Sequence, residues 1–222
     1  MMGPMSENLV STRAQLALCT SRLMARTPRL NLLFLDLDGT VRYSTDPSGF
    51  CNRPEDVAVY PEALAMMDRF KAAYWRIVGV SNQEGVARGD LTWEMAVGVA
   101  RRTGRMAKPA LDLNGRRADF MFDDILICPG DEESNAFRKP NPGMLFAGMQ
   151  NVITRLKAGV VHLEDCLMVG DSDEDRECAR RAGIAFMEAA DWRAGRGVGP
   201  WLKKAEQNLR LMRELKKELG LT

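Results

Sequence analysis

Two aspartates, Asp36 and Asp38, stand two positions apart in a segment that directly follows the apolar run of residues 30–35. Carboxylates at this spacing, on a backbone that leaves a strand for a glycine-containing turn, can both face one pocket. One of them can then attack an electrophile while the other donates and accepts a proton. Asp-Gly is also ordinary turn chemistry, so a plain turn stays an alternative for this segment.

Three further polar segments each follow an apolar run. Ser81 and Asn82 offer a hydroxyl and an amide that suit oxyanion binding. Lys139 precedes a predicted helix and can neutralise the charge of a phosphoryl group in transfer. Asp171 can meet Asp36, and because two carboxylates repel unless a cation joins them, hard oxygen ligands there favour Mg²⁺. The ordinary alternatives are a polar turn, a solvated basic loop and a capped helix start.

Apolar runs alternate with amphipathic stretches along the middle of the chain. The runs predict strands at residues 30–35, 76–80, 125–128, 166–169 and 184–187. The stretches predict helices at residues 61–74, 92–106, 142–156 and 174–182. This alternation predicts an α/β fold, a doubly wound, Rossmann-like parallel sheet covered by helices on both faces. The ligand site of such a sheet lies at the carboxyl ends of its strands, where the four polar segments fall.

The ends of the chain predict helical extensions on this core. We expect an N-terminal extension at residues 1–29 with a helix over 6–26, a core domain at 30–192, and a linker with a C-terminal amphipathic helix at 193–222. The two terminal helices either pack on the core or mediate an oligomer.

Composition excludes several classes of protein. The 222 residues are 45% hydrophobic with a formal net charge of +1, which does not predict a nucleic-acid binder. The net charge is +3 for residues 1–29, +3 for residues 201–222 and −5 for the residues between them. Five cysteines without CxxC spacing predict a reducing, cytoplasmic location rather than a disulfide framework. No leader pattern and no apolar stretch of about 18 residues occurs, so we expect neither export nor a membrane span.

The order and placement of the four polar segments resemble the haloacid dehalogenase superfamily of phosphotransferases. Ser81–Gly89 and Arg138–Met144 look like the capless branch of that superfamily, which contains histidinol-phosphate phosphatases, heptose-bisphosphate phosphatases and polynucleotide 3′-phosphatase modules. The resemblance covers roughly residues 30–190. Only about 20 residues, 41–60, are available for an insertion after the first strand, so we expect no large cap domain and an open pocket.

The resemblance implies a role for each matching residue. Asp36 would attack phosphorus to form an aspartyl-phosphate, and Asp38 would protonate the leaving oxygen and then activate water. The phosphoryl oxygens would be held by Ser81, Asn82 and Lys139.

The same resemblance implies that Mg²⁺ is bound by Asp36, the backbone carbonyl of Asp38, and Asp171. Asp175 would orient the site rather than bind the metal. Arg138 would reach the substrate. Other candidates for contacting the rest of the substrate are Arg42, Tyr43, Arg53 and Arg88, each of which also suits a plain surface position.

The sequence departs from the family in places. Several relatives carry a zinc-binding loop of Cys and His residues before the Arg-Lys-Pro motif, whereas this chain keeps only Cys128 there, so we expect no zinc. Cys128 is predicted to be a core residue. We expect the single histidine, His162, to lie in a turn before a strand and to make a structural hydrogen bond. Ser172 follows Asp171 where relatives often have lysine, which leaves the finer substrate contacts open.

The first functional hypothesis is a Mg²⁺-dependent phosphomonoesterase that hydrolyses a small phosphorylated metabolite of the sugar-phosphate or histidinol-phosphate type. The alternative is a nucleic-acid 3′-end phosphatase, motivated by the open pocket, the basic ends and the arginines at 101–105. No Walker motif occurs, which excludes an attached P-loop kinase. A third hypothesis is a non-catalytic scaffold on the same fold. The sequence does not specify the ester, the pathway, the role of the terminal helices or the oligomeric state.

Overall fold

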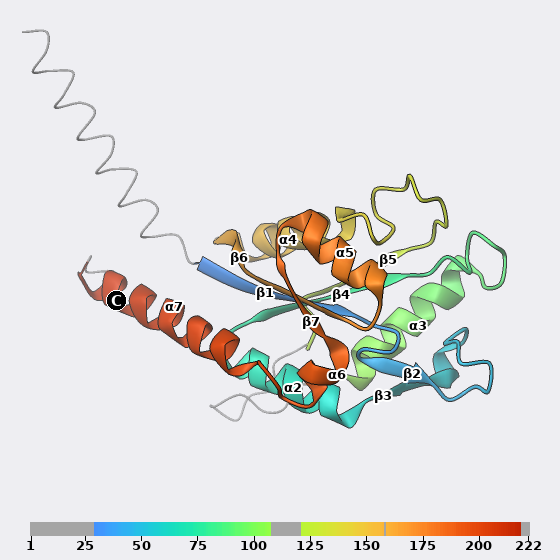
Figure 1. The fold of residues 1–222 in the computed structure, drawn as a ribbon, viewed down its shortest axis with the longest axis horizontal. Helices are drawn as coiled ribbons and strands as arrows, with labels where there is room; N and C mark the ends of the chain where they lie inside the picture. Colours follow the sequence, from blue (N-terminus) through green and yellow to red (C-terminus); the bar gives the residue numbers. More distant parts are fainter. Residues whose placement is uncertain (1–28, 108–120, 158, 219–222) are drawn as a thin grey trace, which may run out of the picture.

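Five parallel strands form the central sheet of the computed structural model, which describes residues 29–107, 121–157 and 159–218. The strands are β1 (Arg29–Asp36), β4 (Arg76–Asn82), β5 (Asp124–Cys128), β6 (Val160–Gly170) and β7 (Ala185–Glu188). Their order in the sheet is β5-β4-β1-β6-β7, and every neighbouring pair is parallel (Figure 1). The predicted α/β class is therefore confirmed, while the predicted helix over residues 6–26 lies outside the described residues.

Helices cover both faces of this sheet. They are α2 (Pro61–Ala72), α3 (Trp93–Met106), α4 (Gly143–Leu156), α5 (Asp173–Ala182), α6 (Ala189–Arg193) and α7 (Gly199–Glu218). Helices α4 and α5 lie on one face, and α2 and α6 lie on the other (Figure 1). Side chains of β1 alternate between the two cores: Phe34 packs under α4 and α5, and Leu33 packs with Trp192 of α6. Because both faces are buried, β1 is apolar throughout its middle, as its sequence predicted.

The segment between β1 and α2 contains a small hairpin. Its strands are β2 (Arg42–Ser44) and β3 (Val57–Val59), which pair antiparallel, and a 3₁₀ turn at Pro54–Asp56 precedes β3. The sequence predicted only a polar loop here, because three-residue strands are too short to show the alternation of apolar and polar residues that marks a strand. Val57 of the hairpin packs against Val99 of α3, and this compact insertion fits the expected lack of a large cap.

One other detail of the prediction was wrong. Strand β6 begins at Val160, so the exposed His162 lies in a strand and not in a turn, because this part of β6 pairs with the start of β1. In the segment predicted as a linker from residue 193, residues 194–198 belong to no helix or strand, and they connect α6, whose Trp192 is fully buried, to α7, which begins at Gly199. Among the described helices, none combines the length and apolar character that crossing a membrane requires.

Candidate active site

The carboxyl ends of the central strands bring the four polar segments together. Strand β1 ends at Asp36, its neighbour β4 ends at Asn82, and its other neighbour β6 ends at Gly170, directly before Asp171. Because parallel neighbours end at the same edge of the sheet, side chains more than 130 positions apart meet there. The sheet edge is thus the place where this sequence can assemble a catalytic site.

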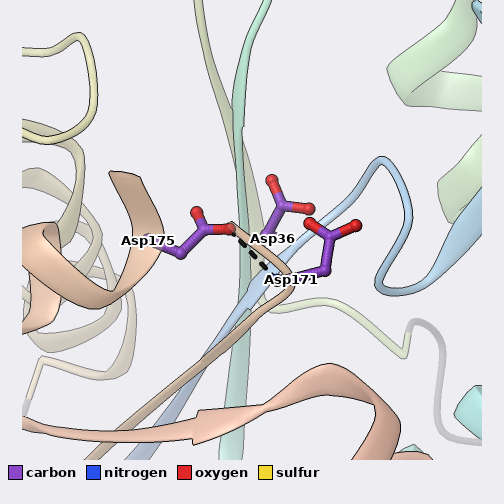
Figure 2. A group of neighbouring side chains, drawn as sticks. All are labelled: Asp36, Asp171 and Asp175. Carbon is purple, nitrogen blue, oxygen red and sulfur yellow. Dashed lines mark hydrogen bonds between the residues drawn. The ribbon is translucent and has the colours of Figure 1, made fainter. Parts of the chain in front are cut away.

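Three carboxyl groups form the centre of this site. Asp36, Asp171 and Asp175 each offer an oxygen within 4.8 Å of the others, and Figure 2 shows Asp175, at the start of α5, pointing toward the other two. Asp36 and Asp175 are buried, whereas Asp171 is open to solvent. Such a group of carboxylates is unfavourable unless a cation neutralises part of its charge.

Lys139 supplies the first neutralising charge. Its buried ammonium group lies 2.5 Å from Oδ1 of Asp36 and 2.6 Å from Oδ1 of Asp175, and it donates a hydrogen bond to each. Burial by itself would lower the pKa of Lys139, but the two carboxylates outweigh burial and raise it. Lys139 therefore stays charged between the two aspartates.

Asp36 has one free oxygen. Burial is the main cause that raises the pKa of Asp36 to about 7, with Asp175 and Asp38 adding to it and Lys139 opposing it. Oδ1 of Asp36 is bound to Lys139, but its buried Oδ2 has no partner among the described residues. A buried carboxylate oxygen without a donor is costly, and it is available to a metal ion or to an electrophile.

Asp175 is held by the helix start on which it stands. Its Oδ2 accepts hydrogen bonds from the backbone N–H groups of Asp171 and Ser172, both at 3.2 Å, and from the Ser172 hydroxyl at 2.7 Å. The Ser172 hydroxyl in turn accepts from the N–H of Asp175, which completes a capping box for α5. Asp175 thus binds the Lys139 ammonium with Oδ1 and three donors with Oδ2, and its predicted role in orienting the site stays a prediction.

Asp38 is bound by a buried arginine. Arg42 donates from Nε to Oδ1 at 2.8 Å and from Nη2 to Oδ2 at 2.7 Å, and its Nη1 donates to the hydroxyl of Thr103 in α3. Ser81 and Gln83 also donate to Oδ2 of Asp38. Burial would raise the pKa of Asp38, but the Arg42 guanidinium outweighs it, and the pKa is lowered. Arg42, which the sequence suggested as a substrate contact or a surface residue, is instead fully buried.

Ser81 and Asn82 lie at the end of β4, on the same side as Lys139. The amide of Asn82 accepts from the N–H of Lys139 at 2.9 Å and donates to the Lys139 carbonyl at 3.0 Å and to Glu174 at 3.1 Å. The side chain of Asn82 thus clamps the backbone of Lys139, and its predicted contact with phosphate stays a prediction.

Arg138 and Arg88, the predicted substrate contacts, lie in ion pairs near the site. Arg138 is paired with Glu84 and Glu174, and Arg88 with Glu84 and Asp90. Their predicted contact with substrate also stays a prediction.

Comparisons with known proteins agree with this geometry. Residues 136–188 match the model of the HAD-hydrolase-like family. A D-glycero-beta-D-manno-heptose-1,7-bisphosphate 7-phosphatase of Mesorhizobium japonicum is 31% identical over 166 residues, covering 71% of this chain and 68% of the relative. The phosphatase of that name from Bordetella bronchiseptica is 31% identical over 159 residues, covering 70% of this chain and 78% of the relative. The chain belongs to the HAD-like hydrolase family.

Solved structures support the same assignment. The crystal structure of the D,D-heptose 1,7-bisphosphate phosphatase from B. bronchiseptica, complexed with magnesium and phosphate, superposes with a TM-score of 0.55 at 27% identity. It covers 82% of this chain and 99% of that one. A HAD-like phosphatase from Mesorhizobium loti gives a TM-score of 0.57 at 26% identity, covering 82% of this chain and 88% of that one. This HAD-like hydrolase is a phosphatase.

The donor set of the phosphatase suits a hard divalent cation. The exposed carboxylate of Asp171 and the unpartnered Oδ2 of Asp36 offer oxygen atoms only, which Mg²⁺ prefers over nitrogen and sulfur ligands. Burial and the neighbouring Asp175 raise the pKa of Asp171, so a cation that joins Asp171 to Asp36 would favour the ionised form of both. The residues present therefore fit the metal.

Sequence reasoning missed two residues that hold the catalytic turn of the phosphatase. Arg193 of α6 donates from Nη1 to the carbonyls of Gly39 and Thr40 at 2.7 and 2.8 Å, and its guanidinium lies over the Tyr60 ring. Gln83 bridges Ser81 and Asp38. No motif in the sequence links residue 193 to residue 39, whereas Gln83 lies within a segment that was already singled out.

Proposed function

We propose that this phosphatase is a Mg²⁺-dependent phosphomonoesterase of a small phosphorylated metabolite, of the sugar-phosphate or histidinol-phosphate type. The observation that carries the proposal is the unpartnered Oδ2 of Asp36, whose carboxyl group lies beside the Lys139 ammonium and the exposed Asp171 carboxylate. A nucleophile, a cation for the phosphoryl oxygens and a metal ligand set are thereby present within one site.

Asp36 acts as the nucleophile in this proposal. A carboxylate oxygen of Asp36 forms a bond to phosphorus while the bond from phosphorus to the ester oxygen breaks, and the leaving oxygen takes a proton from Asp38. The aspartyl-phosphate on Asp36 is then hydrolysed by water, whose proton returns to Asp38. Phosphate leaves, and both aspartates are restored.

Asp38 must change protonation state during this cycle. The Arg42 pair favours the ionised form, which accepts a proton from water in the second step. A phosphate group that enters beside Asp38 raises its pKa again, because a like charge disfavours the carboxylate. The proton donor of the first step is thereby formed when substrate binds.

Lys139 and Ser81 act on the phosphoryl oxygens. The Lys139 ammonium is held against Asp36, so it lies where charge develops on the equatorial oxygens. Asn82 fixes the backbone of Lys139, and it orients this lysine even without touching phosphate. Mg²⁺ would be held by Asp36, Asp171 and the backbone carbonyl of Asp38, and would supply Lewis-acid charge to the phosphate.

Phosphate release from p-nitrophenyl phosphate in the presence of Mg²⁺ tests the proposal. We expect Asp36→Asn to abolish release, because an amide oxygen cannot attack phosphorus, while circular dichroism shows a folded protein. The matched control is Asp131→Asn, which removes an exposed carboxylate in the loop after β5 and should leave the rate unchanged. Release by Asp36→Asn at the wild-type rate, or no release by the wild type across a broad pH range, would contradict the proposal.

A further inference from the structure

The guanidinium group of Arg138 is already bound by two carboxylates. Its Nη2 donates to Oε2 of Glu84 at 2.9 Å and lies 3.4 Å from Oε1 of Glu174, while its Nη1 donates to the carbonyl of Lys139. The side chain is only 13% exposed. Its Nε is buried and has no partner among the described residues.

Arg88 also pairs with Glu84, although its side chain is 50% exposed. Its Nε donates to Asp90 at 3.0 Å, and its Nη1 lies 3.4 Å from Glu84. Two arginines therefore share three carboxylates, those of Glu84, Glu174 and Asp90. This cluster, which we call the rim cluster, carries a net charge of −1 rather than a positive charge.

The rim cluster lies next to the reacting groups. Arg138 precedes Lys139 and Glu174 precedes Asp175, and the Lys139 ammonium contacts both Asp36 and Asp175. Glu174 also accepts from Asn82, which clamps the backbone of Lys139. A substrate whose phosphate reaches Asp36 thus places its remaining atoms near these carboxylates.

One more arginine near the site is also held in place. Arg193 donates to the carbonyls of Gly39 and Thr40 and lies over the Tyr60 ring, so it is fixed beneath the catalytic turn. A second phosphate group on the substrate would therefore meet paired arginines and the three carboxylates of the rim cluster. Like charges placed against one another at a binding surface oppose binding.

We propose that the phosphatase selects phosphate monoesters whose remaining part is neutral or cationic and discriminates against substrates with a second phosphate, because the rim cluster has no unpaired positive charge. This inference rests on the proposed function and deepens it. Glu84 is the specificity-determining residue, since it is the carboxylate shared by Arg88 and Arg138.

The test compares fructose 6-phosphate with fructose 1,6-bisphosphate as a matched pair of probes. We expect the wild type to show a kcat/KM at least about tenfold lower for the bisphosphate, since like charges oppose its binding. Glu84→Gln leaves each arginine with one carboxylate and makes the rim cluster neutral. It should raise the ratio of kcat/KM for the bisphosphate to kcat/KM for the monophosphate about tenfold. Glu206→Gln removes an exposed carboxylate on α7, away from the sheet edge, and should leave the ratio unchanged.

Three outcomes overturn the inference. The first is a wild type that prefers the bisphosphate or treats both probes alike, and the second is a ratio that neither Glu84→Gln nor Glu174→Gln changes in folded protein. The third is faster phosphate release from a 3′-phosphorylated oligonucleotide than from fructose 6-phosphate, because an oligonucleotide is a polyanion. Hydrolysis of p-nitrophenyl phosphate distinguishes failure of this inference from failure of the proposed function. If the wild type releases no phosphate from any ester, the inference and the proposed function both fail.

Discussion

Gly39 allows the turn that follows Asp38 to approach Asp171. Its φ of +77° lies in the left-handed region, and a Cβ built on it would lie 1.9 Å from Oδ2 of Asp171. Its carbonyl accepts from Arg193, so the turn cannot move away freely. A side chain at this position must therefore displace the Asp171 carboxylate.

Gly39→Ala should reduce kcat at least about tenfold and raise the Mg²⁺ concentration needed for half-maximal activity, because Asp171 is pushed out of position. The matched control is Gly49→Ala, since Gly49 has a φ of +81° but no neighbouring atom within 4 Å of an added Cβ. Both substitutions should lower the free energy of unfolding by about 1 kcal/mol through backbone strain. Only Gly39→Ala places a new atom against Asp171, so only this substitution should change the kinetics. Equal effects of the two on Mg²⁺ dependence would contradict the role of Gly39.

At the scale of elements, α7 is attached to the sheet through a buried carboxylate. Asp165 of β6 is fully buried and is paired with Lys204 of α7 at 2.9 Å and with Arg29 of β1. Asn208 of α7 also donates to Asn31, at 3.1 Å. Figure 1 shows α7 leaving the body of the protein beyond these contacts. Whether α7 also mediates an oligomer stays a prediction.

Asp165→Asn should lower the free energy of unfolding at pH 7 by about 2 kcal/mol, because Arg29 and Lys204 both lose their charged partner. Burial would raise the pKa of Asp165, but Arg29 and Lys204 outweigh it and the pKa is lowered. A depressed carboxyl pKa stabilises the fold above its unfolded value of about 3.9, and this stabilisation is lost as pH falls through the folded pKa. The free energies of unfolding of the wild type and Asp165→Asn, measured with denaturant, should therefore converge below about pH 4.

Glu164→Gln is the control for this experiment. Glu164 also pairs with Arg29, but its side chain is 67% exposed, so its loss should cost less than about 1 kcal/mol at pH 7. A difference between Asp165→Asn and the wild type that stays constant from pH 7 to pH 3 would rule out the charge interaction as its cause.

At the scale of the whole molecule, the site concentrates negative charge at one edge of the sheet. Asp36, Asp171 and Asp175 lie within 4.8 Å of one another, and Lys139 compensates only part of their charge. The folded phosphatase therefore carries an electrostatic cost that a bound cation removes, whereas the unfolded chain keeps these groups apart. Metal binding should be visible in the stability of the entire domain.

Mg²⁺ at about 100 times its Kd should add about 2.7 kcal/mol to the free energy of unfolding. For a chain of 222 residues this corresponds to a rise in Tm of roughly 5–10 °C. Asp171→Asn should remove most of the rise, and K⁺ at matched ionic strength should not reproduce it. An equal Mg²⁺-dependent rise in Tm in wild type and Asp171→Asn would contradict this site.

The local pattern of residues was sufficient to predict the sheet and the polar segments at its edge. The alternation of apolar runs and amphipathic stretches predicts the five strands, since a strand buried on both faces must be apolar along its length. Parallel pairing then places Asp36, Ser81 and Asp171 at one edge, because every strand of such a sheet ends on the same side. These conclusions depend only on neighbours in the sequence and on the geometry that all parallel sheets share.

The partners of each side chain were decided only by the tertiary structure. The contact of Arg42 with Thr103, the contact of Arg193 with the turn at Gly39, and the pairing of Arg138 with Glu84 all join segments brought together by packing. The sequence does not distinguish a charged side chain that faces solvent from one that binds a buried carboxylate, since its environment is set by elements distant along the chain. The residue types therefore determined the chemistry that is possible, and the packing decided which charges stay free to perform it.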